Sequence, residues 1–344
     1  MPLPLLLFAL VKVVLLVVVL LTVVAYLVLF ERKLIAHMQS SWGPTRVGPH
    51  GLLQPLADAI KLLTKEDFTP GGAFRVTYLL APCLSLVVAL LAFAVIPFGP
   101  VYHVDGWEVP LQISDLNIGL LFVLSVSSMG VYGIVLAGWS SNSKYSLLGG
   151  LRSSAQMISY ELAISLSLVG VLLLAGSLSL RDIVEAQAGT VWGFVPRWNI
   201  FPQIVGFCCF SVAAIAETNR LPFDLPEAET ELVGGYHTEY SSMKFGMFFM
   251  AEYANMVTVS CMATILFLGG WHGPAFGPPL LQAVLPLLWF SLKVFCFLFV
   301  YIWIRATLPR FRYDQLMAIG WKLLVPVALV NLIVTSLIVA LRAG

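Results

Sequence analysis

The feature that most constrains this chain is a repeat of long apolar segments. Runs of about 18 to 26 apolar residues recur along its 344 residues, and an α-helix of that length matches a hydrocarbon layer about 30 Å thick. Polar stretches between them reach only about 25 to 45 residues. We therefore predict an all-α integral membrane protein, a single polytopic domain over 1–344. The pattern predicts eight spans, at 5–30, 76–96, 117–138, 154–175, 200–217, 245–268, 281–304 and 318–341.

The basic residues predict how the chain is oriented. If the first, third, fifth and seventh loops share one side, they and their flanks hold 14 of the 19 Lys and Arg residues. Cytoplasmic loops carry such an excess. The odd-numbered loops are therefore expected in the cytoplasm and both termini outside. Thirteen of the 18 carboxylates follow the same split, so the near-neutral total predicts a charged cytoplasmic face and a quieter outer face.

A cytoplasmic loop over 217–244 concentrates acidic residues between two apolar segments. Arg220 is the single basic residue in its acidic part, and Tyr236, His237 and Tyr240 lie among the charges. In a chain with only 11% charged residues, such a concentration indicates a site that handles protons or cations. A solvated acidic loop is the alternative, although it would not need the interleaved aromatic residues. The carboxylates are Glu217, Asp224, Glu227, Glu229, Glu231 and Glu239.

The first cytoplasmic loop, over 31–75, is the second strong signal. Glycines and prolines fix an irregular backbone around Arg46 in SSWGPTRVGPHG, and near a membrane such backbone is tolerated against protein or a wet cavity. The next segment predicts an amphipathic helix in the plane of the interface. Its apolar face is expected to contact lipid, a partner subunit or both. That face holds Leu52, Leu53, Leu56, Ile60 and Leu63, and the opposite face holds Gln54, Asp58, Lys61 and Lys65.

Few ionisable residues fall inside the predicted spans. Glu161 and Glu252 lie several residues below the cytoplasmic edge, and Glu217 ends the fifth span. Carboxyl groups at that depth are expensive, and they mark either proton paths or polar contacts that join helices. Because all three lie near the acidic loop, we favour the proton path. Lys293 lies near the middle of the seventh span and needs a partner or water.

Several classes of site find no support in the sequence. The five cysteines fall in or beside apolar spans without a CxxC pair, so the chain offers neither zinc nor iron–sulfur spacing. It shows no phosphate-binding loop, dinucleotide fingerprint or nucleophile elbow. We expect no metal, no catalytic residue acting within this chain alone and no nucleic-acid partner. Any redox cofactors are expected in partner subunits.

Four long segments together resemble the H subunit of respiratory complex I, the proton-pumping NADH:quinone oxidoreductase, whose mitochondrial counterpart is NADH dehydrogenase subunit 1. The resemblance covers essentially the whole chain, in order and with the expected number of spans. The segments are FERKLIAHMQSSWGPTRVGPHGLLQPLADAIKLLTKED, GWSSNSKYSLLGGLRSSAQMISYEL, AETNRLPFDLPEAETELVGGYHTEYSSMKF and IWIRATLPRFRYDQLM.

The resemblance implies a membrane subunit that forms the quinone access path and part of the reaction chamber and couples quinone reduction to proton translocation. It places the chain in the bacterial cytoplasmic (inner) membrane. Partners would be the B, D and I subunits of the peripheral arm and the A, J and K subunits of the membrane arm, together with quinone and lipid. NADH, FMN and iron–sulfur clusters would belong to the partners.

By motif match, the resemblance also assigns site residues. The chamber and its entrance would use Glu31, Arg32, Arg46, Asp58, Lys61 and Lys65. The proton path would use Glu161, Glu217, Arg220, Asp224, Glu227, Glu229, Glu231, Glu239 and Glu252. Some relatives carry a carboxylate in the third span where this chain has Ser128-Met129, so we expect a local rerouting through water.

Three other functions stay open at this point. Membrane-bound hydrogenases and related dehydrogenases use similar subunits. An autonomous ion or proton transporter also needs acids within the membrane, but it would predict internal repeats, and none is evident in the sequence. A passive scaffold for the peripheral arm explains the charged loops but not Glu161 and Glu252.

Overall fold

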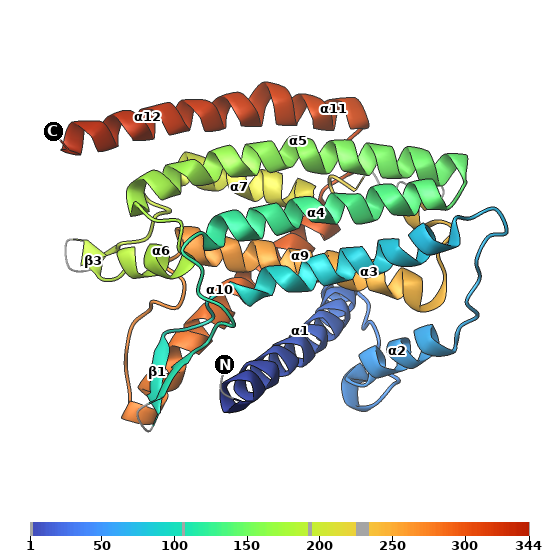
Figure 1. Ribbon diagram of the computed structural model, residues 1–344, viewed down its shortest axis with the longest axis horizontal. Coiled ribbons are helices and arrows are strands. Elements are labelled where there is room, and N and C mark those ends of the chain that lie inside the picture. Colours follow the sequence, from blue (N-terminus) through green and yellow to red (C-terminus); the bar gives the residue numbers. More distant parts are fainter. Residues whose placement is uncertain (1–2, 105–106, 192–194, 225–233, 344) are drawn as a thin grey trace.

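The computed structural model describes residues 3–104, 107–191, 195–224 and 234–343, and helices dominate it (Figure 1). Within these residues, seven helices are long and apolar enough to cross a membrane. The prediction of an all-α, multi-span membrane protein is confirmed. The long helices are α1 (Leu3–Met38), α3 (Arg75–Leu91), α4 (Gly119–Ser140), α5 (Lys144–Ala175), α9 (Ser242–Phe267), α10 (Pro279–Thr307), and α12 (Val325–Ala343), which continues α11 (Tyr313–Ala318) and the π-helical turn η4 (Ile319–Leu324).

Shorter elements connect the long helices. The short helices are α2 (Gln54–Thr64), α6 (Leu180–Ala186), α7 (Ile204–Glu217), and the single turns η1 (Pro49–Gly51), η2 (Ala92–Ala94) and η3 (Gly235–His237). Two small antiparallel hairpins lie in loops on the predicted outer side. They pair β1 (Val101–Val104) with β2 (Trp107–Pro110), and β3 (Thr190–Val191) with β4 (Val195–Pro196).

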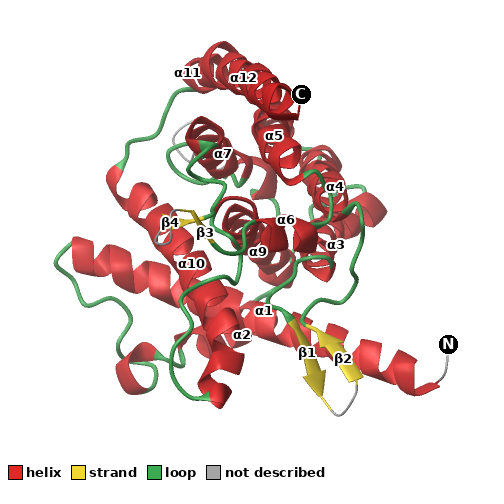
Figure 2. Ribbon diagram, turned by 90° about the vertical axis from the view of Figure 1, so that its left-hand side faces the viewer, coloured by secondary structure: helices red, strands yellow, loops and turns green. Residues whose placement is uncertain are grey.

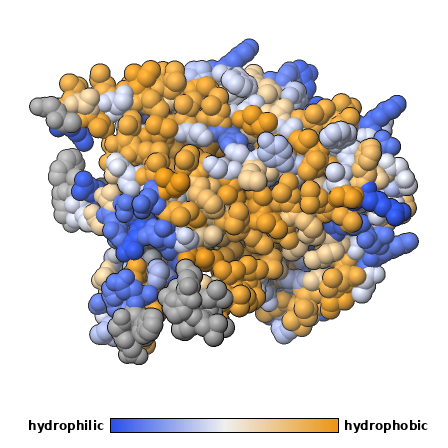
Figure 3. Space-filling model, in the orientation of Figure 1, coloured by the Kyte–Doolittle hydropathy of each residue, from blue (hydrophilic) through white to orange (hydrophobic). Residues whose placement is uncertain are grey.

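Helix α9 lies at the centre of the bundle. Figures 1 and 2 show α3, α4, α5, α7, α9 and α12 running in roughly one direction, while α1 and α10 cross them obliquely. Of the most apolar window of α9, 72% is buried, against 17% for the last span. Hydrophobic residues cover most of the face in Figure 3. That surface is what a bundle in contact with lipid or membrane partners must present.

Helix α7 is shorter than the span predicted over 200–217. It has 14 residues, about 21 Å at 1.5 Å per residue, which falls short of the ~30 Å hydrocarbon layer. Residues 201–203 form a turn that includes Pro202, and the Ile200 amide donates to the Phe267 carbonyl at the outer end of α9. Starting at that end, α7 finishes inside the bundle. The polar turn after Glu217 is therefore surrounded by protein.

Two helices extend further toward the predicted cytoplasmic side than the sequence indicated. Helix α1 continues to Met38 rather than ending at residue 30, so the predicted loop over 31–75 loses its first residues to a helix. Helix α5 begins at Lys144 rather than 154. Glycines allow this extension to pack closely, because a Cβ atom at Gly149 would lie 2.7 Å from the Cα atom of Gly235.

Lys293, in the middle of α10, has its partners within the chain. Its Nζ atom donates to the carbonyls of Leu268 at 2.7 Å, Gly270 at 2.9 Å and His272 at 2.7 Å, and it lies 4.6 Å from the centre of the Trp198 ring. These carbonyls follow the carboxyl end of α9, where a positive charge is favoured. Lys293 therefore fixes the loop that ends the central helix.

We expect Lys293→Met to destabilise the protein by about 1–3 kcal/mol, because one buried and two partly buried carbonyls lose their donor. The measurement is the midpoint of thermal unfolding of the detergent-purified assembly. Lys12→Met is the matched control, since Lys12 Nζ donates to a single carbonyl, that of Pro110 at 3.0 Å. Equal midpoints for the two variants would show that the carbonyl cluster does not depend on Lys293.

Candidate functional site

Glu31 of α1 stands at the centre of a buried ionic cluster. Its carboxylate accepts hydrogen bonds from the Tyr253 hydroxyl at 2.8 Å and from the Arg305 guanidinium. The Arg220 guanidinium lies 3.7 Å from the same carboxylate. Residues from α1, α9, α10 and the turn after α7 thus meet at one point. Glu31 is only 5% exposed, and burying a charged group is costly unless partners of this kind surround it.

Arg220 joins Glu31 to a second carboxylate on the central helix. Its Nε atom lies 2.6 Å from Glu252 Oε1, in a geometry too bent to count as a hydrogen bond. Its guanidinium carbon lies 4.1 Å from the centre of the Tyr253 ring. Burial tends to lower the pKa of Arg220, but Glu252, Tyr253 and Glu31 together hold it above its ordinary value. Arg220 therefore stays cationic at any physiological pH.

The polar turn after α7 is held by neighbouring helices. The Gln156 side chain of α5 donates to the carbonyls of Ala216 at 2.8 Å and Phe223 at 2.7 Å. Asn219 donates to Ser153 at 3.3 Å. At the far end of the turn, Asp224 accepts from Arg310 at 3.4 Å. These contacts satisfy backbone groups in a segment that water cannot reach freely, and they fix the position of Arg220.

Two adjacent serines of α4 contact two carboxylates deeper in the bundle. Ser127 Oγ donates to Glu217 Oε1 at 2.5 Å, and Ser128 Oγ donates to Glu161 Oε1. Because Ser127 and Ser128 are neighbours, α4 links the end of α7 to the middle of α5. Each of these two carboxylates thus accepts a hydrogen bond from a hydroxyl group of α4. Ser128, where the resemblance led us to expect a rerouted path, contacts Glu161 directly.

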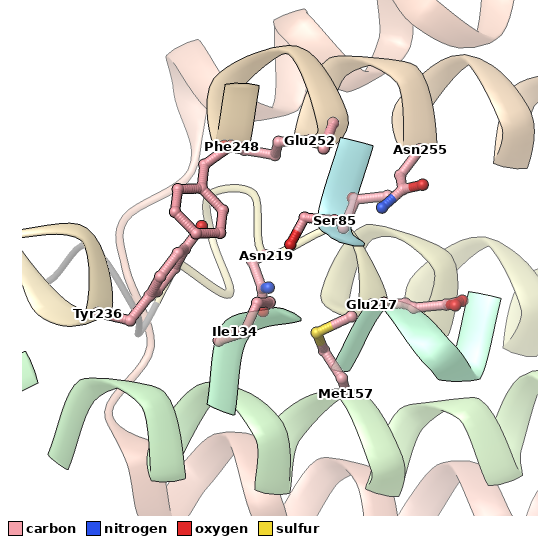
Figure 4. Close-up of a pocket in the computed structure, with 12 residues that line it drawn as sticks. Ser85, Ile134, Met157, Glu217, Asn219, Tyr236, Phe248, Glu252 and Asn255 are labelled. Atoms are coloured by element: carbon pink, nitrogen blue, oxygen red, sulfur yellow. The ribbon is translucent and has the colours of Figure 1, made fainter. Parts of the chain in front are cut away.

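Two small cavities lie between the ionic cluster and these carboxylates. In the first, the volume open to the centre of a water molecule is about 40 Å³, and Glu252 and Glu217 both line it (Figure 4). The second is about 20 Å³, and Ser127 lines it together with Glu217. Met157, Glu217, Thr218 and Asn255 line both. The first cavity has room for water, and two carboxylates of the predicted proton path lie at its wall.

The predicted chamber residues separate into two groups. Arg32 Nη1 donates to Asp58 Oδ2 at 2.7 Å, which ties α1 to α2, and Ser242 Oγ of α9 donates to the Leu62 carbonyl at 2.9 Å. Arg46, Lys61 and Lys65 are exposed at the surface.

The five apolar residues predicted on one face of the amphipathic helix are all exposed, by 49–67%, so within the described chain nothing covers that face. They are Leu52, Leu53, Leu56, Ile60 and Leu63.

The grouping of the remaining residues differs in part from the sequence prediction. Glu31 was assigned to the chamber, but its side chain belongs with Arg220 and Glu252. Arg220 was also expected to be the one cation near the acids, whereas Arg305 and Arg310 pair with Glu31 and Asp224. Glu239 is half-buried, and its carbonyl accepts from the Tyr78 hydroxyl at 2.6 Å.

Three carboxylates of the predicted proton path lie outside the residues that the structure describes, and three residues of the site were not predicted from the sequence. Glu227, Glu229 and Glu231 lie outside the described residues. The sequence analysis overlooked Tyr253, Arg305 and Ser127 as partners. A signal existed for Tyr253, which follows Glu252 directly in the sequence. Among the described residues, no group of three or more His, Cys, Asp or Glu side chains is arranged to hold a metal ion.

Comparisons with known proteins identify the family of the chain. The family described as NADH dehydrogenase matches residues 11–336. The chain is 60% identical to the second of the numbered NADH-quinone oxidoreductase H subunits of Koribacter versatilis, with 98% of each chain covered. It is 54% identical to the first H subunit of Solibacter usitatus, with 96% of each covered, and 55% identical to the first H subunit of Geobacter sulfurreducens, with 96% of this chain and 95% of the relative covered. The chain therefore belongs to the NADH dehydrogenase family, among the H subunits of NADH-quinone oxidoreductase.

Proposed function

We propose that this membrane subunit forms the quinone access path and part of the quinone chamber, and that it couples quinone reduction to proton translocation. The observation that carries the proposal is a series of buried and partly buried polar groups. Glu31 and Arg220 lead to Glu252, Glu252 and Glu217 line the first cavity together, and the neighbouring serines of α4 donate hydrogen bonds to Glu217 and Glu161. Intramembrane carboxylates linked in this way are typical of proton relays.

The chamber end of the proposal rests on α2 and its neighbours. Helix α2 is joined to α1 by the Arg32–Asp58 ion pair and to α9 by the bond between Ser242 and Leu62. Its apolar face is exposed, and a quinone tail leaving the bilayer needs an apolar surface beside an opening toward a polar chamber. We assign the access path to the region between α1, α9 and α2. Arg46, Lys61 and Lys65 belong to the polar side of this entrance.

The coupling step follows from charge in a poorly screened environment. Quinone reduction adds two electrons and takes up two protons, so negative charge appears transiently near the cluster of Glu31, Arg220 and Glu252. Where the effective dielectric constant is low, two unit charges several ångströms apart interact by several kcal/mol. Closely spaced carboxylates respond as a set and share protons among themselves. The charge change therefore shifts protons along Glu252, Glu217 and Glu161.

The proposal also covers location, partners and cofactors. The chain is a multi-pass membrane protein, and we assign it to the bacterial inner membrane with both termini outside, from the distribution of basic residues. The B, D and I subunits would dock on its cytoplasmic face, and the A, J and K subunits beside it in the membrane. NADH, FMN and iron–sulfur clusters would be held by those partners, which makes the chain a subunit of the enzyme without activity of its own.

Purification in a mild detergent tests the assignment. An affinity tag on this chain should recover iron–sulfur subunits and NADH:quinone reductase activity in one complex. A chain that purifies alone and transports ions in vesicles without partners would contradict the proposal and favour an autonomous transporter. Recovery with hydrogenase activity instead of NADH oxidation would assign a different electron donor to the same membrane subunit.

A bulky residue on α2 should discriminate between quinones by tail length. Ala57 is half-buried and Ala59 exposed, on the helix that borders the access path. We expect Ala57→Phe and Ala59→Phe to lower kcat/KM for long-tailed quinone by roughly three- to tenfold, about 0.7–1.4 kcal/mol. Short-tailed analogues should be affected much less.

The control for this experiment is Ala188→Phe, which adds the same ring at an exposed site in an outer loop. It should change neither value. Equal losses for long-tailed and short-tailed quinones in the α2 variants would show that α2 is a docking surface for a partner subunit and not a border of the access path.

A further inference from the structure

The last membrane span carries a lysine on its outward surface. Lys322 lies in η4, the π-helical turn that leads into α12, and its side chain is exposed. Among the described residues, no hydrogen bond or ion pair holds its ammonium group. A charge within a membrane span is costly unless a partner or the membrane surface accommodates it. Lys322 therefore needs a partner that these residues do not supply.

The depth of Lys322 places its charge close to the lipid headgroups. The span covers 30 residues, Tyr313 to Arg342, about 45 Å at 1.5 Å per residue, so about 7 Å extends beyond a ~30 Å hydrocarbon layer at each end. Lys322 follows Tyr313 by nine residues and thus lies roughly one helical turn inside that layer. Helical side chains lean toward the amino end of their helix, here the predicted cytoplasmic side. A lysine in this position extends its ammonium group to the headgroup level.

The two faces of the last span differ in the residues that they present. Figures 1 and 2 show α12 at the edge of the bundle, beside α5. The inner face uses small or polar residues: a Cβ atom at Gly320 would lie 3.5 Å from the Tyr160 ring, Ala328 is fully buried, and Asn331 donates to Gln203 at 2.8 Å. Helices that pack together within a membrane favour such small residues at their contacts. The outer face instead carries bulky aliphatic side chains, exposed by 47–62%, at Leu329, Val330, Ile333 and Leu337.

These aliphatic residues continue from Lys322 along one stripe of the helix. Leu329, Ile333 and Leu337 follow Lys322 by seven, eleven and fifteen residues, a spacing that keeps side chains on one face. From Lys322 to Ile333 the stripe measures about 16 Å, which is about half of the ~30 Å hydrocarbon layer. The stripe therefore has the length of one lipid leaflet, with the positive charge at its headgroup end.

Trp321 fixes the surface beside the lysine. Its ring is half exposed, and its indole nitrogen donates to Ser159 Oγ of α5 at 3.2 Å. Tryptophan gathers at the level where headgroups meet the hydrocarbon layer, which agrees with the depth derived for Lys322. A cation, an interfacial tryptophan and an aliphatic stripe thus occur together on one surface.

We propose that this surface binds an anionic phospholipid of the cytoplasmic leaflet. The lipid phosphate pairs with the Lys322 ammonium group, and an acyl chain lies along Leu329, Ile333 and Leu337. An anionic headgroup is favoured over a zwitterionic one because it carries no ammonium group of its own to compete with the lysine. The bulky outer face favours acyl chains over a further protein helix. The inference goes beyond the proposed function, since neither quinone access nor proton transfer uses this surface.

Photolabelling of the complete complex in phosphatidylcholine vesicles tests the site. Two probes with the same photoreactive acyl chain are compared, one with a phosphatidylglycerol headgroup and one with a phosphatidylcholine headgroup. Labelled residues are identified by mass spectrometry of peptides. We expect the phosphatidylglycerol probe to label Leu329 to Leu337 roughly fivefold more, the factor that corresponds to about 1 kcal/mol for one basic residue at an anionic headgroup.

Two variants assign the preference to Lys322. Lys322→Met should remove the excess labelling by the anionic probe, and Lys322→Arg should keep it. Val14 and Val18 of α1 are the internal control, because they are exposed and the nearby Lys12 already donates to the Pro110 carbonyl. They should be labelled equally by both probes in all three proteins. If Lys322→Met fails to assemble, the comparison of the two probes in wild type still decides.

Three results would overturn the proposal. Equal labelling of Leu329 to Leu337 by the two probes in wild type would show that Lys322 selects no headgroup. An excess that persists in Lys322→Met would show that the lysine does not hold the phosphate. Label on Val14 and Val18 but none on Leu329 to Leu337 would show that a partner subunit covers this surface, and a carboxylate of that partner would then be the counter-charge of Lys322.

Discussion

Replacing Arg220 by methionine should lower quinone reductase activity by at least about tenfold. Arg220 and Glu31 side chains are each 6% exposed, and Arg220 also pairs with Glu252. Removing one member of a buried ion pair costs about 3–5 kcal/mol. If only a third of that cost is added to the activation free energy of quinone reduction, the rate falls by a factor of about ten. Arg305 still compensates Glu31, whereas Glu252 loses its ion pair with Arg220.

The measurement is NADH:quinone reductase activity of membranes, with assembly checked on native gels. Arg181→Met is the matched control, because Arg181 pairs with Asp115 and Glu185 on the predicted outer side, and 35% of its side chain is exposed. Such surface pairs contribute about 0–1 kcal/mol, so that variant should be nearly normal. Arg220→Met should also be more harmful than Glu229→Gln. An assembled Arg220→Met complex with normal activity would contradict a role for the cluster.

Replacing Glu217 or Glu161 by glutamine should nearly abolish coupled proton transfer while the complex still assembles. Glutamine has almost the volume of glutamate, and it can still accept from Ser127 or Ser128 as the carboxylate does. What disappears is the transferable proton. We expect proton translocation to fall on the order of a hundredfold, the low end of what positioned proton-transfer groups contribute.

Proton uptake by reconstituted vesicles, measured with a pH-sensitive dye during NADH oxidation, checks this result. Glu185→Gln serves as the control, because Glu185 is an exposed carboxylate paired with Arg181 on the predicted outer side. It should pump normally. Wild-type pumping in both Glu217→Gln and Glu161→Gln would remove these residues from the path.

The sequence was sufficient to predict the spans because hydrocarbon thickness sets helix length. The predicted 117–138 and the observed Gly119–Ser140 differ by two residues at each end. The prediction for 200–217 was less accurate, since apolar composition alone does not show that α7 starts only at Ile204. That difference matters for function, because a short α7 places Glu217 and Arg220 inside the bundle and not at its surface.

The pairing of charges could not be predicted, because it depends on how helices cross. Glu31 and Arg305 are 274 residues apart in the sequence, and their contact requires the oblique crossing of α1 and α10. The contacts of Ser127 and Ser128 with Glu217 and Glu161 likewise depend on the rotation of α4. Hydropathy along α4 carries little information about that rotation, because apolar residues surround the whole helix. Glu227 and Glu231 are four residues apart, a spacing at which two carboxylates of a helix interact, and their coupling is a prediction that the described residues do not test.

Infrared difference spectroscopy of the complete complex, comparing oxidised and reduced quinone, tests the central claim most directly. Protonated carboxyl groups absorb in a region of the spectrum free of amide bands, so a change in their protonation is seen as a difference signal. If quinone reduction shifts protons through the buried carboxylates, wild type shows a carboxyl signal that diminishes in Glu217→Gln and Glu161→Gln and persists in Glu185→Gln. Identical carboxyl signals in all four proteins would show that these groups keep their protonation during turnover, and the coupling proposed for this subunit would be wrong.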